Sequence, residues 1–372
     1  MNNKRQFIDR LFDANYVDTE VQEALEEIEK LQRRETQTLR TGIPHMDFFL
    51  FDGLTNKMVF IGSRPGMGKT HNCARVIKNL LDNDINPENV SILRLNWEMQ
   101  TKSLLLRNIK MYLKKSMRQI LSKPFEAEEM EAVTEAVNEI KNPKIKNISE
   151  IIEGADLEYM LEAFCKSGDP NEEKVVLIDH LHILNDKDRI DRFLSICNQF
   201  KLRYKKLSFI FYFQLNRTLE NLWRGKDSNP RNYRPNSSHI YNTDNLMQYA
   251  DIICTMVIPQ VVNLDNYAVV NKKYCPNLEE HFIDEGDSNW VKLEGRNRVY
   301  FDYIKVRMVD DFDDPRLYCE ILSLQKEEEM KGEVQDELPA FMKTGNQVVD
   351  SGNLLMPMHL EDPEEGDDDI PF

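Results

Sequence analysis

The sequence lacks long hydrophobic runs, a leader peptide and paired cysteines. No stretch approaches the roughly 18 apolar residues that a membrane-spanning helix needs, and the first residues, MNNKRQFIDRLF, are too polar for a signal peptide. The six cysteines lie far apart without a CxxC pair. This pattern argues against a disulfide framework or a zinc site and favours buried thiols in a reducing cytoplasm.

A strong acidic charge is confined mainly to one end of the chain. The formal net charge is −16 over 372 residues, but residues 326–372 hold fourteen acids and three lysines, a net −11, so residues 1–325 carry only −5. Apolar periodicity also fades after about residue 326, which predicts a disordered acidic tail over 326–372. Any nucleic-acid-binding surface on the nearly neutral body must be local, because no global basic field attracts phosphates.

The first 40 residues predict one or two amphipathic helices. Apolar side chains recur at helical spacing after Asp18, a plausible N-cap: Val21, Ala24, Leu25, Ile28 and Leu31. A segment of this size cannot bury its own apolar stripe. We expect residues 1–40 to dock on the chain's own body or on a neighbouring subunit.

From about residue 41 to residue 325, short apolar runs alternate with helical patterns. Four runs read as buried parallel strands: Met58–Ile61, Val90–Leu95, Val175–Ile178 and Leu207–Phe213. Three later runs can complete the sheet: Ile252–Val257, Tyr303–Val306 and Leu317–Leu322. Two stretches interrupt them, a polar segment over 221–245 that predicts a long mobile loop and an irregular insertion at about 258–300. The fold class is therefore α/β, with a mostly parallel, doubly wound sheet flanked by helices.

A phosphate-binding loop follows the first strand and opens a helix. The segment GSRPGMGKT provides glycines for a tight backbone path, Lys69 for the β- and γ-phosphates, and Thr70 for Mg²⁺, at a helix N-terminus. Ser63 stands where the general pattern begins with glycine. We expect ATP to contact the following residues: Ser63, Arg64, Pro65, Gly66, Met67, Gly68, Lys69, Thr70 and His71.

Two acidic residues are expected at the same sheet edge. Glu98 closes the second strand, where a carboxylate can polarise the water that attacks the γ-phosphate. Asp179 closes a wholly apolar strand, and a buried carboxylate there needs a cation or donors, such as Mg²⁺ held through water. His180 and His182 follow this position, but no third ligand lies nearby to complete a metal site.

The segments RPGMGKT, LRLNWEM, KVVLIDHLHIL, FQLNRTLE and YIKVRMV resemble, in this order, the motifs of the DnaB-type replicative DNA helicases. The resemblance covers about residues 41–325 and implies a RecA-like ATPase that hydrolyses ATP with Mg²⁺. It also implies that Gln214 senses the γ-phosphate, and that Lys305 and Arg307 reach the γ-phosphate of the neighbouring subunit. The family usually has serine where this chain has Phe213.

The same resemblance places the DNA contacts within residues 231–245. This region contains Arg231, Tyr233, Arg234, His239 and Tyr241, and arginines beside aromatics can combine phosphate contacts with base stacking. Tyr241 and Asn242 occupy the positions of the family's usual Arg-Glu pair. Arg231, Arg234, Tyr241 and Asn242 are the candidate contacts to single-stranded DNA.

The resemblance further implies a homo-oligomeric ring, expected to be a hexamer, without the N-terminal collar that recruits primase. Residues 1–40 correspond to the linker helix alone, an architecture that we expect of a phage- or mobile-element-encoded protein in a bacterial cell. The tail ends in Asp367, Asp368, Asp369, Ile370, Pro371 and Phe372. This ending resembles the tip of bacterial single-stranded DNA-binding protein and implies docking to proteins that recognise that tip.

These features predict an ATP-dependent, ring-forming DNA helicase that translocates on single-stranded DNA, 5′→3′ by the family's example. Two other functions remain open from the sequence. One is a RecA-fold ATPase that loads or remodels proteins on DNA without unwinding. The other is an interaction protein that uses ATP as a switch and its tail as bait.

Overall fold

A computed structural model of the chain describes residues 21–22, 25–26, 28–30, 38–50, 53–224, 233–240, 243–264, 266–271, 290–294, 298–307 and 319–323. The chain divides into two units, Met1–Leu324 and Gln325–Phe372, and the described residues all belong to the first. No described helix is long and apolar enough to cross a membrane.

An eight-stranded sheet forms the centre of the fold, in the order β10-β9-β6-β1-β5-β4-β2-β3. Its strands are β1 (Met58–Ser63), β2 (Val90–Asn96), β3 (Ile145–Ile148), β4 (Glu173–Asp179), β5 (Leu207–Gln214), β6 (Ile252–Val257), β9 (Arg298–Val306) and β10 (Cys319–Ser323). The pairs from β6 to β3 are parallel, and β9 and β10 join antiparallel. The predicted mostly parallel α/β class is confirmed.

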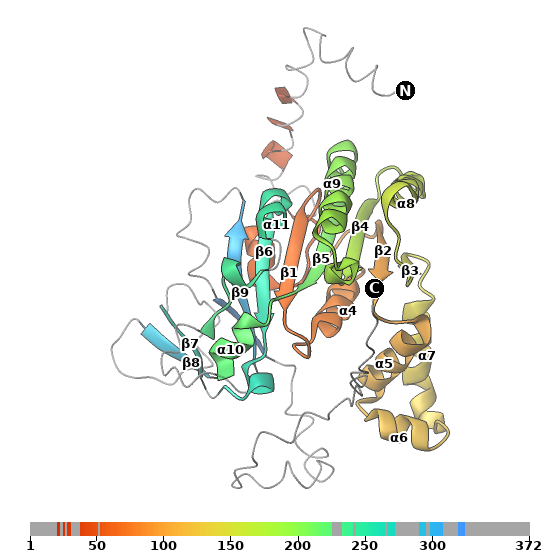
Figure 1. The fold of residues 1–372 in the computed structure, drawn as a ribbon. Helices are drawn as coiled ribbons and strands as arrows, with labels where there is room; N and C mark the ends of the chain where they lie inside the picture. The colour runs from red at the N-terminus through yellow and green to blue at the C-terminus, as the bar shows by residue number, and fades with distance from the viewer. Residues whose placement is uncertain are drawn as a thin grey trace, which may run out of the picture. The chain divides into compact units, whose positions relative to one another are not determined.

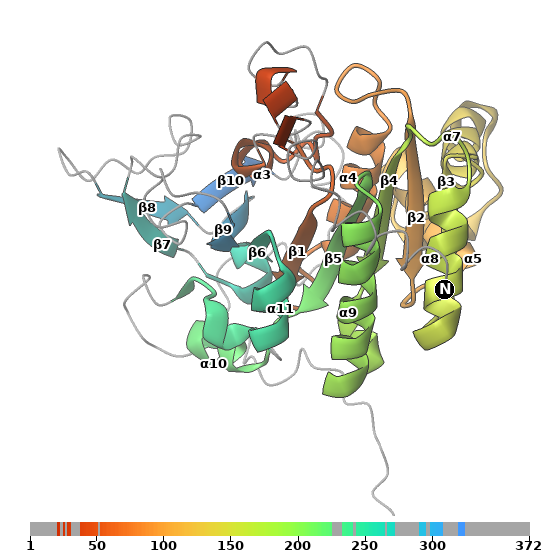
Figure 2. The ribbon, with the colours of Figure 1, turned by 90° about the horizontal axis from the view of Figure 1, so that it is seen from above.

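Helices cover both faces of the sheet (Figures 1 and 2), with α4 on one face and α9 and α11 on the other. The helices are α3 (Pro44–Phe49), α4 (Lys69–Leu80), α5 (Thr101–Leu113), α6 (Met117–Ser122), α7 (Met130–Ile140), α8 (Gly154–Lys166), α9 (Lys187–Arg203), α10 (Thr218–Arg224) and α11 (Thr243–Tyr249). The central strands β1 and β5 are buried almost throughout, because helices shield both faces of a parallel sheet from water.

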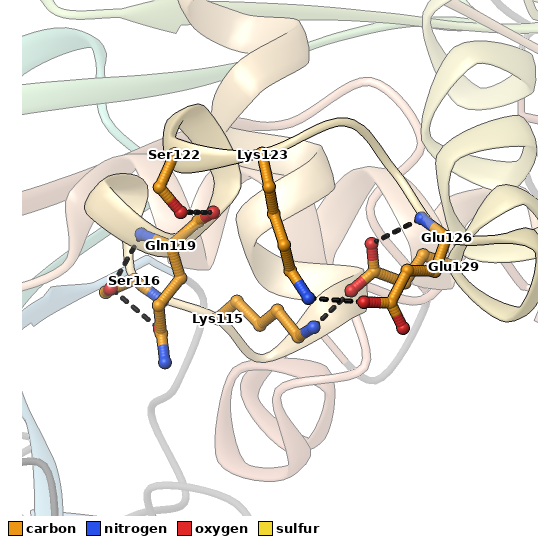
Figure 3. A network of polar contacts seen from close by, with 7 residues as sticks. All are labelled: Lys115, Ser116, Gln119, Ser122, Lys123, Glu126 and Glu129. Atoms are coloured by element: carbon orange, nitrogen blue, oxygen red, sulfur yellow. Dashed lines mark hydrogen bonds and ion pairs between the residues drawn. The ribbon is translucent and has the colours of Figure 1, made fainter.

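The helices α5, α6 and α7 form a small unit with its own apolar cluster, Ile109, Ile120 and Ala136, beyond the β3 end of the sheet. Its turns are fixed by polar contacts (Figure 3). Ser116 and Gln119 form a capping box at the start of α6, which satisfies N–H groups that helix starts leave unpaired. Lys115 pairs with Glu129, and Lys123 pairs with Glu126.

The insertion predicted at about 258–300 contains a separate two-stranded antiparallel sheet, β7 (Asn266–Asn271) with β8 (Trp290–Glu294). It lies at the end of the main sheet opposite α5–α7 (Figures 1 and 2). The described parts of the segment 221–245 contain more secondary structure than the predicted loop. These parts include the end of α10, a 3₁₀ turn at Ser237–His239 and the start of α11.

Candidate nucleotide site and its distant basic pair

The phosphate loop lies between the end of β1 and the start of α4. Gly66 and Gly68 have φ angles of 81° and 79°, a left-handed conformation that glycine adopts without the Cβ penalty of other residues. Lys69 and Thr70 then open α4, so the first N–H groups of this 12-residue helix face the loop. The structure thus has the strand–loop–helix context that phosphate binding requires.

The carboxyl ends of β4 and β2 lie beside this loop. Asp179 closes β4 and is paired in register with Asn96, the last residue of β2. Asp179 is fully buried, and both of its carboxylate oxygens lack a well-formed hydrogen bond within the described structure, although the Thr70 hydroxyl is near enough to lower its pKa. Burial raises the pKa of Asp179, against the opposing influence of the Arg94 charge. A carboxylate in this state fits a hydrated cation, which supplies the missing partners.

Lys69 is also buried and lies close enough to Asp179 and Glu98 to interact with their charges. Burial lowers the pKa of Lys69, while the negative charges of Asp179 and Glu98 raise it. Glu98 lies two residues beyond the end of β2 rather than within it, and it is exposed. Its Oε2 atom is 4.0 Å from Nε2 of His180. Lys69, Asp179 and Glu98 therefore share one electrostatic environment.

Gln214 lies next to the phosphate loop. It closes β5 in register with Ser63 on β1, and its backbone N–H donates to Nδ1 of His182 over 3.1 Å. From the sequence, His182 is a substituted motif position and not a metal ligand. His182 lies in the 3₁₀ turn that follows β4, and its hydrogen bond to Gln214 links this turn to the carboxyl-terminal end of β5.

Arg64 points away from the loop's helix and towards the segment after β5. Its guanidinium donates to the Leu215 carbonyl over 2.6 Å and, through Nε, to Glu220 of α10 over 2.7 Å. A second guanidinium nitrogen also pairs with Glu220. Arg64 is 6% exposed, so these contacts fasten the phosphate loop to α10. Among the other predicted nucleotide contacts, Pro65, Gly66 and His71 are exposed, Gly68 and Thr70 are partly buried, and Ser63 and Met67 are buried.

Lys305 and Arg307 lie near the amino-terminal ends of β1 and β6, whereas the phosphate loop follows the carboxyl-terminal end of β1. Val306 pairs with Ile252 at the start of β6, and the N–H of Asp251 donates to the Met58 carbonyl at the start of β1. The phosphate loop begins after the other end of this six-residue strand. At about 3.3 Å per residue the two ends of β1 are roughly 20 Å apart, so one chain's basic pair does not reach its own Lys69.

The candidate DNA contacts are only partly described. Arg231, Tyr241 and Asn242 lie outside the described residues, as does the tail from Asp367 to Phe372. Arg234 forms an ion pair with the buried Asp302 over 2.5 Å, and Asp302 also accepts from Tyr267.

Two other residues of this region have structural contacts. His239 is buried, and its Nδ1 accepts from the Asn236 N–H over 3.0 Å. The Tyr233 carbonyl accepts from Nε1 of Trp223 over 2.9 Å. The sequence does not reveal the Arg234–Asp302 pair, because the two residues are 68 positions apart along the chain.

Comparisons with known proteins agree with this architecture. The family model described as the DnaB-like helicase C terminal domain matches residues 38–283, more than half of the chain. A solved structure described as an "ATPase Domain" superposes with a TM-score of 0.58 at 21% identity, covering 82% of this chain and 94% of that one.

A second structure, "The Structure Of A DnaB-Like Replicative Helicase And Its Interactions With Primase", superposes with a TM-score of 0.54 at 22% identity. The alignment covers 77% of this chain and 61% of that one, so this chain spans about three fifths of that helicase. At these identities the two superpositions establish the fold. No curated protein sequence matches the chain.

Proposed function

Since this chain belongs to the DnaB-like helicase C-terminal domain family, we propose that it is the ATP-hydrolysing core of a DNA helicase whose active sites are completed between subunits. One observation carries the proposal. The phosphate loop and Asp179 lie at the carboxyl-terminal ends of the parallel strands, whereas Lys305 and Arg307 lie near the amino-terminal ends of β1 and β6. A single chain therefore holds two halves of a site that cannot meet, and a neighbouring chain can join them.

The residues at the phosphate-loop end of the sheet bind the nucleotide and activate it for hydrolysis. Lys69 neutralises phosphate charge, and the exposed Glu98 carboxylate can orient and polarise the attacking water. Asp179, through water, and the Thr70 hydroxyl would hold Mg²⁺, because the two unpartnered Asp179 oxygens fit a hydrated cation. When bound, Mg²⁺ neutralises charge on the phosphates. Gln214 contributes a neutral amide that can donate to phosphate without fixing a charge.

Lys305 and Arg307, at the opposite end of the strands, supply positive charge to the nucleotide of the next subunit. Arginine's rigid fork of donors suits the charge that develops on a transferring phosphoryl group. A head-to-tail arrangement of this kind closes into a ring, for which we propose a hexamer. The N-terminal helix supports this assembly, because Val21, Leu25 and Ile28 are each about half exposed on the chain itself and can bury their apolar surface on a neighbour.

We place single-stranded DNA near the segments 225–232 and 241–242, with Arg231, Tyr241 and Asn242 as candidate contacts. Arg234 has a different place in this proposal. Its ion pair with buried Asp302 makes it an anchor for the segment rather than a free phosphate ligand. Translocation in the 5′→3′ direction follows the family's example.

The acidic tail is proposed to recruit proteins that recognise the tip of single-stranded DNA-binding protein, through Ile370, Pro371 and Phe372. Recovery of partners on immobilised full chain, with and without Phe372, tests this. A loss of recovery on removing Phe372 supports the docking signal, and equal recovery refutes it.

A strand-displacement assay on a forked DNA duplex tests the helicase, with the Lys69→Ala variant as the inactive control. Unwinding that needs ATP and Lys69 supports the proposal. DNA-stimulated ATP turnover without unwinding favours a loader or remodeller, and negligible turnover favours an ATP-switched interaction protein.

A further inference from the structure

Asp251 is the centre of a charged cluster at the sheet edge away from the phosphate loop. Its Oδ2 accepts from the Met58 N–H over 2.8 Å and from the Lys201 ammonium over 3.0 Å. Its Oδ1 lies 3.2 Å from Nη1 of Arg307. The carboxylate is nearly buried at the start of β6, so its position is set by the strand below it and by α9.

Arg307 is held at three points although its side chain is 42% exposed. Its backbone N–H donates to the Asp251 carbonyl over 2.7 Å, Nη1 meets the Asp251 carboxylate, and Nη2 donates to the Gln248 carbonyl over 2.6 Å. An exposed arginine ordinarily samples many rotamers, and restricting them costs conformational entropy. Here the carboxylate and the end of α11 have already fixed the direction of the guanidinium.

The described residues of the cluster carry more positive than negative charge. Lys201 and Arg307 both pair with Asp251, and Lys305 donates to the Met247 carbonyl beside them. Burial lowers the pKa of Lys305, the Arg307 charge lowers it further, and Asp251 opposes both. Among the described residues, one carboxylate thus lies beside three cations and pairs with two of them, and an incoming anion would balance the remaining positive charge.

We propose that Asp251 is a positioning residue that aims Arg307 at the nucleotide of the neighbouring subunit. Lys201, buried on α9, keeps the carboxylate in place, so Arg307 cannot draw Asp251 outwards when a phosphate approaches. Asp251 itself touches neither nucleotide nor metal. The inference rests on the proposed function, because it requires Arg307 to act across a subunit interface.

Steady-state ATP turnover of full-length Asp251→Asn, Arg307→Ala and the double variant tests the inference. Asparagine keeps an acceptor for the Met58 N–H but loses the charge that orients Arg307. We expect kcat to fall about tenfold or more in Asp251→Asn with KM changed less than about threefold, since misplacing a group costs rate more than binding. The double variant should match Arg307→Ala, and additive losses would overturn the inference.

Mixed assemblies give a readout that general destabilisation does not produce. An Asp251→Asn chain retains its own phosphate loop, so mixing it with Lys69→Ala chains, which donate an intact Arg307, should restore turnover. Mixing it with Arg307→Ala chains should restore none, because both lack a correctly placed arginine. Restoration in the second mixture would show that Asp251 does not act through Arg307.

Two controls keep these outcomes distinct. Asp84→Asn, an exposed loop carboxylate, should leave kcat unchanged. If Asp251→Asn does not fold because the Lys201 ammonium is left buried and unpaired, Asp251→Asn combined with Lys201→Met is measured in its place. If Arg307→Ala alone retains wild-type turnover, the proposed shared site fails, whatever the Asp251 variants do.

Discussion

At the scale of single residues, two departures from the expected motifs fit one another. Gly62 on β1 pairs in register with Phe213 on β5, and a Cβ atom at residue 62 would lie 2.4 Å from the Phe213 ring. Phe213 replaces the family's usual serine, and the glycine that precedes Ser63 leaves room for its ring. Neither position is informative alone, and only the strand register shows that they belong together.

Gly62→Ala should therefore destabilise the fold by about 1–3 kcal/mol, the typical cost of forcing an extra carbon into a packed core. The penalty should shrink in a Phe213→Ser background, where the ring is absent. A double-mutant cycle in chemical unfolding measures both effects. Equal penalties in the two backgrounds would contradict this steric account.

Asp179→Asn should have opposite effects on stability and turnover. Removing a buried charge without hydrogen-bond partners should raise the free energy of unfolding of the nucleotide-free protein by about 1 kcal/mol or more. ATP turnover should fall at least about a hundredfold, because the site loses its carboxylate for Mg²⁺. Denaturant titration and steady-state kinetics check the pair of outcomes, and a less stable variant would refute the first.

At the scale of elements, the contact between the phosphate loop and α10 should influence nucleotide binding. Glu220→Gln weakens the charged hydrogen bonds to the nearly buried Arg64, contacts of a kind worth about 1.5–3 kcal/mol. We expect ATP-analogue affinity to fall roughly tenfold, measured by calorimetry. Glu126→Gln, in the exposed pair with Lys123 (Figure 3), is the matched control and should bind like wild type.

The packing of α5 against α7 should depend on pH through Glu139. Its carboxylate accepts from Asn108 over 3.1 Å and from Tyr112 over 3.3 Å, and burial raises its pKa above the ordinary 4.5. The unfolded chain therefore loses this proton at lower pH than the folded one. As pH rises above 4.5, the free energy of unfolding of the wild type therefore declines relative to that of a variant with a non-titrating side chain at residue 139.

Glu139→Gln should accordingly gain stability relative to wild type as pH increases from about 4.5, the ordinary carboxyl value. Unfolding at several pH values measures the difference. Glu131→Gln, an exposed position on the same helix, should show little change. A Glu139→Gln advantage that is constant with pH would rule out this titration as its source.

The elements that sequence predicts well are those with strong local signals. The buried runs of β1, β2, β4, β5 and β6 are almost entirely apolar, and glycine with lysine marks the phosphate loop. Sequence patterns miss the four-residue β3 because Lys146 and Asn147 interrupt its apolar pattern. They also place Glu98 at the strand end, although the strand ends two residues earlier.

The contacts that set function are less predictable than the elements. The Arg64–Glu220 pair and the Asp251–Arg307 pair join residues that are 156 and 56 positions apart. Such pairings depend on strand order and on helix packing. Local propensity carries no information about either.

At the scale of the whole molecule, charge is divided between a nearly neutral body and a tail of net −11. Deleting residues 326–372 should raise affinity for single-stranded DNA at low salt by removing this repulsion. The gain should vanish towards about 1 M salt, where the screening length is about 3 Å. Fluorescence anisotropy over a salt series measures it, and a chain lacking only Phe372 is the control. A salt-independent gain would exclude an electrostatic cause.

The roughly 20 Å between the phosphate loop and Arg307 has a consequence for how activity should scale with assembly. If every working site needs the loop of one chain and the arginine of the next, an open row of chains always has one idle loop and one idle arginine at its ends. A lone chain then has no complete site, and two chains have one. Closing the row removes both ends at once, so turnover per chain should rise with the length of the row and reach its maximum only at closure.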